Sequence, residues 1–374
     1  MKILFVSDID VSSSNYAGNK NAFLSLAHYL SNYHEIHHLN LHRKRGVAQC
    51  FNKTFYFPRY INMLKRKLIS YTKIQSKQRM VSYKSSIWLS LFVKFLDLKY
   101  KYDYVIVEYL ELHCSIDFIE PAKRICDLHD IMYLRKKSFI EGGLIVSSGL
   151  NVTLAEELML MNKFSKLLVI QENELQYLSA SNLNSKLILV KRSPINVENL
   201  PNKQDVNINK LRLGFIGNTA EFNVDAFSYI LDELLPQIEL LHDVELVIAG
   251  AICNSVLIDK NTKIRVLGLV DKVGDFYKEI DVLLNPIRYG SGLKTKNIEA
   301  LSYGVPVLTT RCGIEGMDFL LGSAINVFDN KDDFLKSILI YKENTYSNKQ
   351  VKDIYFKYFG PDVCYRELLD TLND

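Results

Sequence analysis

The chain lacks the features of a membrane-spanning or secreted protein. None of its apolar runs approaches the roughly 20 residues that a spanning helix needs. The apolar stretch 1–6 passes directly into Ser7 and Asp8, which is not the pattern of a signal-peptide core. Its six cysteines are scattered without the paired spacing of a metal site, which favours reduced structural thiols. We therefore expect a cytosolic protein.

Acidic residues are missing from one long stretch. There is no Asp or Glu between Glu35 and Asp97, although the net charge of the 374-residue chain is only +4. Lysine, arginine and interleaved aromatic residues fill this stretch, and we call residues 43–94 the basic region. It is typical of a peripheral contact with anionic lipid headgroups. A site for a polyanionic glycan or a lipid-pyrophosphate acceptor, or a plain solvated face, fits the same charges. No nucleic-acid-binding motif accompanies them, so nucleic acid is not an expected partner.

Strand-like and helix-like segments alternate along the chain, which predicts an α/β protein with parallel sheets. Its length suits two such domains. The pattern breaks at a polar, Asn-rich stretch, so we expect a first domain over 1–192, a linker over 193–210, a second domain over 211–346 and terminal helices over 347–374. The expected strands lie at 1–6, 104–108, 124–127, 166–170, 187–190, 211–216, 244–249, 264–267, 281–285 and 306–309, and the expected helices at 19–30, 223–235, 349–359 and 362–372.

The most informative stretch runs from Asn285 to Thr310 and has the pattern strand, glycine loop, helix, strand. The loop residues Gly290, Ser291, Gly292 and Leu293 give flexible backbone just before a helix whose N-terminal amides can face an anion. Lys294 and Lys296 add positive charge there, and cations at a helix N-terminus are unfavourable unless an anion lies nearby. Glu299, on the same helix face as Lys296, could accept hydrogen bonds from a ribose diol. Solvated lysines at a helix start are the alternative interpretation.

This stretch resembles the donor-site motif of retaining nucleotide-sugar glycosyltransferases of the GT-B class, in particular their fourth family (group 1-like). Glu299, Ala300, Gly304, Pro306 and Val307 match the motif, and Ser291 occupies the position of its first Glu. The resemblance implies two facing Rossmann-like domains with a cleft between them. It also implies donor binding in the C-terminal domain, acceptor binding in the N-terminal domain, and terminal helices that cross back after a kink at Gly360-Pro361.

A second donor-site segment is the turn at Gly217 and Asn218. Family members often carry an Arg just after this glycine and a Lys a few residues later, and both hold the donor diphosphate. Asn218 stands at the Arg position, and no basic residue follows before the helix. The resemblance therefore leaves the diphosphate to Lys294, Lys296, backbone amides or Arg288, with Ser291 or amides in place of the missing Glu.

Two residues of the first domain complete the predicted site. Gly18 matches the second of two glycines that let the family's backbone approach the donor, although a simple turn before a helix explains it equally well. His129 follows the strand expected at 124–127, so it should emerge at the carboxyl edge of the sheet, facing the cleft. Many family members carry a His there that contacts the donor sugar. A hydrogen-bonded loop pair with a neighbouring Asp is the alternative.

The resemblance implies transfer of a sugar from a nucleoside-diphosphate sugar to an acceptor hydroxyl, with retention of anomeric configuration. His129, Lys296 and Glu299 are the predicted catalytic residues. No cofactor or metal is expected, because the donor half has no Asp-X-Asp pair in a suitable loop and lysines can neutralise the leaving group. A glycan or lipid-linked acceptor in bacterial surface polysaccharide synthesis is our expectation. A donor-binding scaffold with decayed catalysis and a sugar-nucleotide epimerase stay as alternatives. The absence of Gly-X-Gly-X-X-Gly argues against a nicotinamide dehydrogenase.

Overall fold

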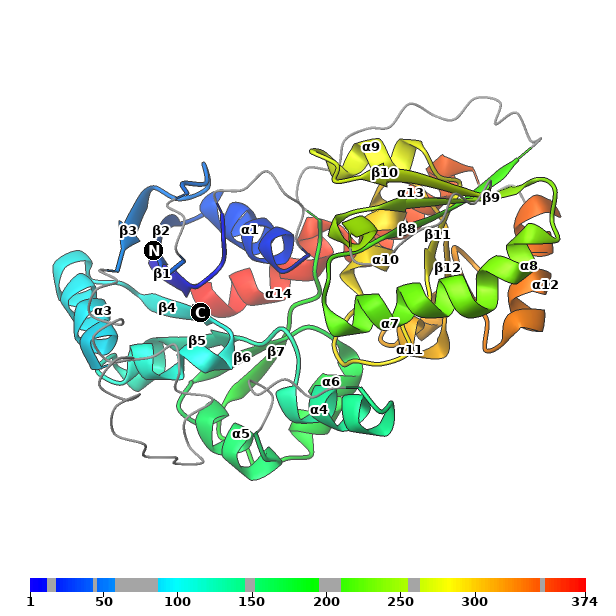
Figure 1. The fold of residues 1–374 in the computed structure, drawn as a ribbon. Helices are drawn as coiled ribbons and strands as arrows, with labels where there is room; N and C mark the ends of the chain where they lie inside the picture. Colours follow the sequence, from blue (N-terminus) through cyan, green and yellow to red (C-terminus); the bar gives the residue numbers. More distant parts are fainter. Residues whose placement is uncertain are drawn as a thin grey trace.

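The structure of the protein, a computed structural model, consists of two α/β halves, each built on a parallel sheet (Figure 1). It describes residues 1–11, 18–42, 46–57, 87–144, 152–194, 210–254, 263–343 and 347–374. Most of the predicted linker and much of the basic region, at 43–45 and 58–86, lie outside the described residues. The parallel α/β class predicted from the sequence is confirmed.

The first sheet has seven parallel strands in the order β3-β2-β1-β4-β5-β6-β7. They are β1 (Lys2–Ser7), β2 (Glu35–Asn40), β3 (Lys53–Tyr56), β4 (Tyr104–Glu108), β5 (Arg124–Asp127), β6 (Lys166–Val169) and β7 (Lys186–Leu189). Its α-helices are α1 (Gly18–Ser31), α3 (Ile87–Tyr100), α4 (Met132–Glu141), α5 (Leu154–Met161) and α6 (Glu172–Ser179), with short 3-10 turns at Leu110–Ile116 and Pro121–Lys123.

The second sheet has six parallel strands in the order β10-β9-β8-β11-β12-β13. They are β8 (Leu211–Ile216), β9 (Val244–Ala249), β10 (Ile264–Gly268), β11 (Val282–Asn285), β12 (Val307–Thr309) and β13 (Ile325–Val327). The helices are α7 (Glu221–Tyr229), α8 (Leu235–Glu239), α9 (Val273–Lys278), α10 (Thr295–Ser302), α11 (Arg311–Ile314) and α12 (Lys331–Glu343). A π-helical turn at Ile230–Leu234 joins α7 to α8, so the single helix expected at 223–235 is wound unevenly.

The last two helices, α13 (Asn348–Phe359) and α14 (Pro361–Asn373), connect the two halves. Helix α13 packs on α10, while α14 packs on α1 and β7 of the first sheet. The Tyr365 hydroxyl donates to Ser25 Oγ at 2.9 Å, and the Tyr29 hydroxyl donates to Asp362 at 2.8 Å. Gly360 separates the two helices, and Pro361 begins the second one, where its missing N–H is tolerated. The two sheets therefore share a continuous apolar core through these helices.

Three strands were not predicted. In β2, His37 and His38 are both fully buried, and each makes a hydrogen bond, His37 Nδ1 with the Tyr102 hydroxyl at 2.7 Å and His38 Nε2 with Ser7 Oγ at 2.8 Å. Burial lowers the pKa of His38 to about 3, so its ring is neutral. This strand was not predicted because several of its buried residues are of polar type. The other two, β3 and β13, are edge strands of four and three residues, too short for a periodic pattern.

Within the ranges described above, no helix combines the length and the apolar character needed to cross a membrane.

Candidate active site

A cleft of about 660 Å³ lies between the two halves, at the carboxyl ends of strands from both sheets. Open parallel sheets bind ligands at this edge, because loops and helix N-termini converge there. Nine of the residues predicted from the sequence line it: Gly18, His129, Gly217, Asn218, Gly290, Ser291, Leu293, Lys294 and Lys296. Three other residues named from the sequence, Gly292, Glu299 and Arg288, do not line it.

The glycine loop has the backbone that its sequence predicts. Gly290 and Gly292 have φ values of +126° and +76°, a region that residues with a side chain rarely adopt. A Cβ atom on Gly292 would lie 3.0 Å from the carbonyl oxygen of His129 in the other half of the protein. The loop is therefore packed against the first domain, which explains why Gly292 is buried beneath the cleft instead of lining it.

Helix α10 begins at Thr295, so its first turn borders the cleft. Lys294 precedes the helix, and its ammonium group donates to the carbonyl of Gly292 at 2.9 Å and lies 3.7 Å from Glu315. The first turn of α1 comes from the opposite side: a Cβ on Gly18 would lie 3.1 Å from Thr295 Oγ1. Two helix N-termini, each with a partial positive charge, therefore meet at the cleft.

Two asparagine side chains, linked to each other, hold Lys296 in place. The Lys296 ammonium group donates to Asn223 Oδ1 at 2.6 Å, and Asn223 Nδ2 donates to Asn218 Oδ1 at 2.5 Å. Burial lowers the pKa of Lys296 to about 8, because desolvation outweighs the attraction of Glu299. Asn218, at the position of the family's Arg, thus contributes through Asn223 to the placement of a cation.

Ser291 and Arg288 have partners that the sequence did not reveal. The Ser291 hydroxyl donates to Asp130 at 3.1 Å, and Asp130 also pairs with Arg135 at 3.0 Å. The expectation that Ser291 holds the donor in place of a Glu is not supported in this arrangement, since its hydroxyl joins the two halves. Arg288 does not line the cleft, and two of its nitrogens, Nη2 and Nε, donate to Asp225 at 2.6 and 3.1 Å, which argues against a contact with the diphosphate.

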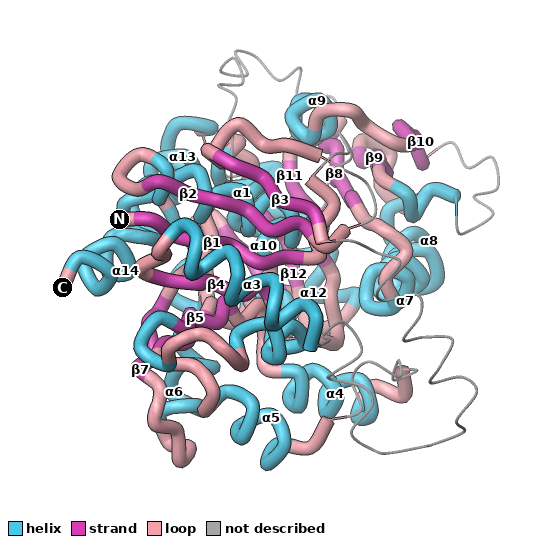
Figure 2. Tube along the Cα trace, turned by 90° about the vertical axis from the view of Figure 1, so that its left-hand side faces the viewer, coloured by secondary structure: helices cyan, strands magenta, loops and turns pink. Residues whose placement is uncertain are grey.

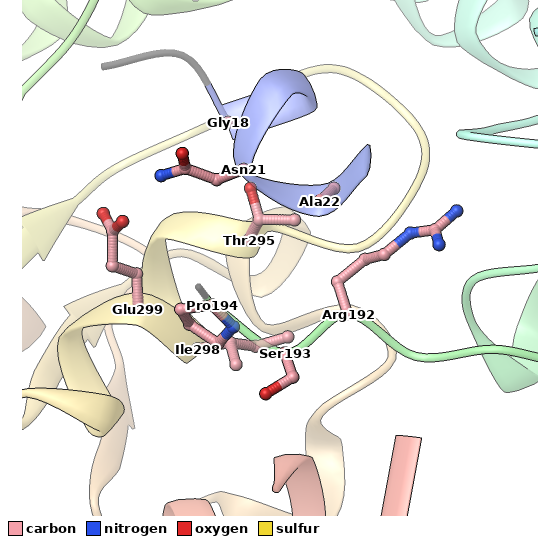
Figure 3. A pocket seen from close by; sticks show the side chains of 9 residues that line it. All are labelled: Gly18, Asn21, Ala22, Arg192, Ser193, Pro194, Thr295, Ile298 and Glu299. Atoms are coloured by element: carbon pink, nitrogen blue, oxygen red, sulfur yellow. The ribbon is translucent and has the colours of Figure 1, made fainter. Parts of the chain in front are cut away.

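Glu299 lies beside a second, smaller cavity (Figure 3). It is 3% exposed, and the hydroxyl of Tyr277 donates to its carboxylate at 3.0 Å. In the figure, Gly18 and Asn21 of α1 lie over Thr295 of α10, with Glu299 one helical turn farther along. The predicted contact of Glu299 with a ribose stays a prediction, and a ligand in the main cleft would have to extend along α10 to reach it.

His129 emerges after β5 and faces the cleft, as its position predicted. Its Nε2 lies 2.8 Å from the carboxyl oxygen of Glu108, and its ring stacks on Tyr109 with centroids 4.0 Å apart. Burial lowers the pKa of His129 to about 4 and raises that of Glu108 to about 8. A neutral imidazole hydrogen-bonded to an un-ionised carboxyl therefore faces the cleft at neutral pH, suited to orienting a sugar hydroxyl rather than to carrying charge.

Backbone strain accompanies this pair. Tyr109 has a φ of +67°, a left-handed conformation that costs a residue with a side chain about 1 to 2 kcal/mol. Strain of this kind persists where surrounding contacts fix the residue, and it is frequent at functional sites. The ring of Tyr109 stacks on the ring of His129, so the backbone conformation just after β4 helps to set the position of the imidazole.

The sequence reasoning missed Arg192, which lines both cavities and is 2% exposed. Its guanidinium is paired with buried Asp127 at the end of β5, and two of its nitrogens, Nε and Nη1, have no hydrogen-bond partner among the described residues. Arg192 follows β7 by three residues, so the rule that identified His129, a polar residue just after a parallel strand, would have found it.

Glu108, Asp127 and His129 place one potential metal-ligand atom each within 4.8 Å of the others. The donor set could hold a metal ion by residue type. The guanidinium of Arg192 already pairs with Asp127, however, and a metal cation at the same carboxylate would be repelled by it. The residues therefore fit a metal poorly, and the absence of a metal requirement stays a prediction.

Comparison with known proteins places this geometry in context. Residues 210–339, which include β8 to β13, match a family model described as "Glycosyl transferases group 1". A search of curated protein sequences gives no match.

Several solved structures are similar in fold. HepE from Anabaena, in complex with UDP and glucose, is 14% identical, with a TM-score of 0.67 over 100% of this chain and 99% of that chain. TarM from S. aureus, in complex with fondaparinux, alpha-GlcNAc-glycerol and UDP, is 11% identical, with a TM-score of 0.70 over 100% of both chains. Sucrose-phosphate synthase from Thermosynechococcus elongatus is 13% identical, with a TM-score of 0.65 over 99% of both. These likenesses confirm the GT-B fold, and the family match over residues 210–339 agrees with the resemblance to glycosyltransferases inferred from the sequence.

Proposed function

We propose that this protein is a glycosyltransferase that moves a sugar from a nucleoside-diphosphate sugar to an acceptor hydroxyl with retention of anomeric configuration. The observation that carries the proposal is the position of Lys296 and Lys294 at the first turn of α10, across the cleft from His129. Uridine diphosphate is the nucleotide we propose first, since the HepE and TarM structures both contain UDP.

The proposed chemistry follows from where charge develops. As the bond between the anomeric carbon and the diphosphate breaks, the leaving group gains negative charge, and groups already oriented toward it lower the barrier. Lys296, held by Asn223, and the N-terminal turn of α10 are placed for this role. Binding of a diphosphate beside Lys296 would also raise the lowered pKa of its ammonium group and keep it charged.

Retention is proposed to proceed by attack of the acceptor on the face from which the diphosphate leaves. Among the described residues that line the cleft, Asp130 is the one carboxylate, and it is engaged by Arg135 and Ser291. That engagement argues against Asp130 as a covalent nucleophile. His129 and Glu108 would position the sugar in this scheme, and the acceptor hydroxyl would lose its proton to the departing phosphate.

The acceptor is proposed to be a glycan or a lipid-linked glycan of a bacterial surface polymer, with the enzyme acting in the cytoplasm. Support comes from the cleft, which is lined by residues of both halves, and from TarM, whose structure contains a glycan and a glycosylated glycerol. The basic region predicted from the sequence suits an anionic acceptor of this kind.

The test is nucleotide binding followed by product analysis. Thermal shift and calorimetry with UDP, GDP, ADP and CMP should select one nucleotide, and incubation of its sugar with glycan acceptors should give a product whose anomeric configuration NMR reports. We expect Lys296→Ala to weaken nucleotide binding about tenfold or more. The matched control is Lys349→Ala, which removes a lysine from the same position of helix α13 but on the exposed surface.

Three outcomes would contradict the proposal. Equal losses in both lysine variants would remove the assigned role of Lys296. Conversion of the sugar nucleotide without any acceptor would indicate an epimerase. Nucleotide binding without transfer to any acceptor in a broad panel would indicate a donor-binding scaffold.

A further inference from the structure

Helix α3 carries apolar side chains on two opposite faces. Its inner face, with Leu89, Val93 and Leu96, is buried against the first sheet and belongs to the core of the first domain. Its outer face exposes five large apolar residues: Ile87, Trp88, Leu91, Phe95 and Leu98. A helix at the surface of a water-soluble domain normally places polar residues on its outer side. This helix does not.

The exposed residues form one continuous stripe, which we call the outer face of α3. At about 100° per residue, their positions fall within an arc of about 100° on the helix. Trp88, Phe95 and Leu98 are 59%, 54% and 66% exposed. Single exposed apolar residues are common, but a contiguous row of this size on one helix marks a contact surface. Figures 1 and 2 show α3 at the outer side of the first sheet, away from the second domain.

Charge on and around α3 is positive. Lys99 lies beside the outer face, with its ammonium group 6.0 Å from the ring centroid of Phe95, and Lys53 lies 4.7 Å from that of Tyr100. The single carboxylate of the helix, Asp97, is 6% exposed and lies 3.5 Å from Lys94 and 3.6 Å from Lys123. The outer face therefore offers apolar surface with cations beside it, and its own carboxylate is turned inward and paired.

The sequence that leads into α3 adds to this charge. Between residues 58 and 86 there is no Asp or Glu, and the basic residues are Arg59, Lys65, Arg66, Lys67, Lys73, Lys77, Arg79 and Lys84. An anionic bilayer complements both properties, because its headgroups attract the cations and its acyl boundary accepts the apolar side chains. A protein partner would need an acidic rim around an apolar groove, whereas a lipid surface supplies both components over any area.

We propose that α3 is a membrane-docking helix whose outer face inserts into the headgroup and acyl boundary of an anionic bilayer. The helix lies in the plane of the membrane surface and does not cross it. Trp88 and Phe95 are the largest inserting side chains, and Lys53, Lys94 and Lys99 contact the headgroups. This inference rests on exposure and charge in the first domain and does not depend on the proposed sugar transfer.

Trp88 provides the measurement, because it is the only tryptophan in the chain. In buffer its half-exposed ring should emit like a solvated indole. On addition of vesicles of phosphatidylcholine with phosphatidylglycerol, we expect a blue shift, and quenching by lipids brominated near the top of the acyl chain. Vesicles of phosphatidylcholine alone should produce a much smaller change.

Flotation with the same vesicles tests the stripe directly. The double variant Trp88→Ser, Phe95→Ser should lower the partition coefficient at least about tenfold. The matched control is Leu240→Ser, Phe356→Ser, which replaces two apolar residues that are 72% and 56% exposed elsewhere on the surface. Equal melting temperatures of the two variants establish that neither substitution unfolds the protein.

Three results would overturn the inference. Absence of flotation with anionic vesicles would exclude membrane docking. Flotation without any change in Trp88 emission would mean that the basic region adsorbs electrostatically and α3 does not insert. A blue shift that grows with protein concentration in the absence of lipid would show that a second copy of the chain covers the outer face.

Discussion

The ammonium group of Lys296 lies 2.6 Å from the side-chain oxygen of Asn223, and this contact links the first turn of α10 to the first turn of α7. Both residues line the cleft between the two halves. The contact gives a lysine, otherwise flexible, one defined position at the place where we propose that a diphosphate binds.

Nucleotide affinity should depend on the charge of Lys296. Its pKa is lowered to about 8 by burial, so the cation is present below that pH and is lost as the pH rises through it. We expect affinity for the nucleotide to fall severalfold between about pH 7 and pH 9.5. Lys296→Arg should show a flatter profile, because arginine stays charged throughout this range. Calorimetry over pH measures both, and the nucleotide's own titration is common to the two proteins. Parallel profiles would contradict the assignment.

Asn223 should act through Lys296. Asn223→Ala removes the oxygen that fixes the ammonium group, and we expect nucleotide binding to weaken about tenfold. If Asn223 only positions Lys296, the double variant Asn223→Ala, Lys296→Ala should bind no more weakly than Lys296→Ala alone. Dissociation constants of the four proteins, measured by calorimetry, decide this. Additive losses would mean that Asn223 contacts the nucleotide independently.

Glu108 should make the wild-type protein less stable as the pH rises. Its side chain is fully buried, and burial raises its pKa to about 8, so the folded state keeps a proton that the unfolded state releases near pH 4.5. Stability is therefore lost between these two pH values as the pH increases. Glu108→Gln has no such titration, and relative to the wild type it should gain at least about 1 kcal/mol between pH 5 and pH 8.

Urea unfolding at several pH values gives the difference in free energy between the two proteins. A difference that does not vary with pH would show that the Glu108 carboxyl is ionised in the folded state. Turnover provides a second readout, because Glu108→Gln preserves a hydrogen-bonding group next to His129, whereas Glu108→Ala removes it. We expect the alanine variant to lose more activity than the glutamine variant.

Gly292 should be required for the closed contact between the two halves. Gly292→Ala forces a side chain onto a φ of +76° and places its Cβ 3.0 Å from the carbonyl of His129. The matched control is Gly322→Ala, at a φ of +78°, where nothing lies within 4 Å of the added atom. Both variants should lose about 1 kcal/mol of stability from backbone strain. Only Gly292→Ala should also lower turnover of the donor, by about tenfold. Equal turnover in the two variants would show that the interdomain contact does not matter for the reaction.

Several elements were predictable because their signals are local. The strands at 104–108, 124–127 and 244–249 match β4, β5 and β9 residue for residue, since buried parallel strands are short uninterrupted apolar runs. The strand, glycine loop, helix and strand from Asn285 to Thr310 are also present as expected. His129 was found by the same logic, because a residue that follows a parallel strand must lie at the carboxyl edge of the sheet.

The partners of the site residues could not be predicted, because they come from distant parts of the chain. Ser291 bonds to Asp130, which is 161 residues away, and Arg288 bonds to Asp225, which is 63 residues away. A motif shows which groups stand near one another along one loop, but it does not show what the opposing domain presents to them. The sequence therefore predicts Ser291 as a contact to the sugar, whereas in the structure its hydroxyl contacts Asp130 of the other half.

By itself, the sequence determined two tandem α/β units and the place of the glycine loop at the first turn of α10, because hydrophobic periodicity and glycine spacing act over a few residues. Tertiary structure decided which side chains face the cleft, how Lys296 and His129 acquire their lowered pKa values, and that the apolar outer face of α3 is exposed among the described residues. Burial, desolvation and pairing depend on the packing of segments far apart in the chain, and no local pattern of residues encodes them.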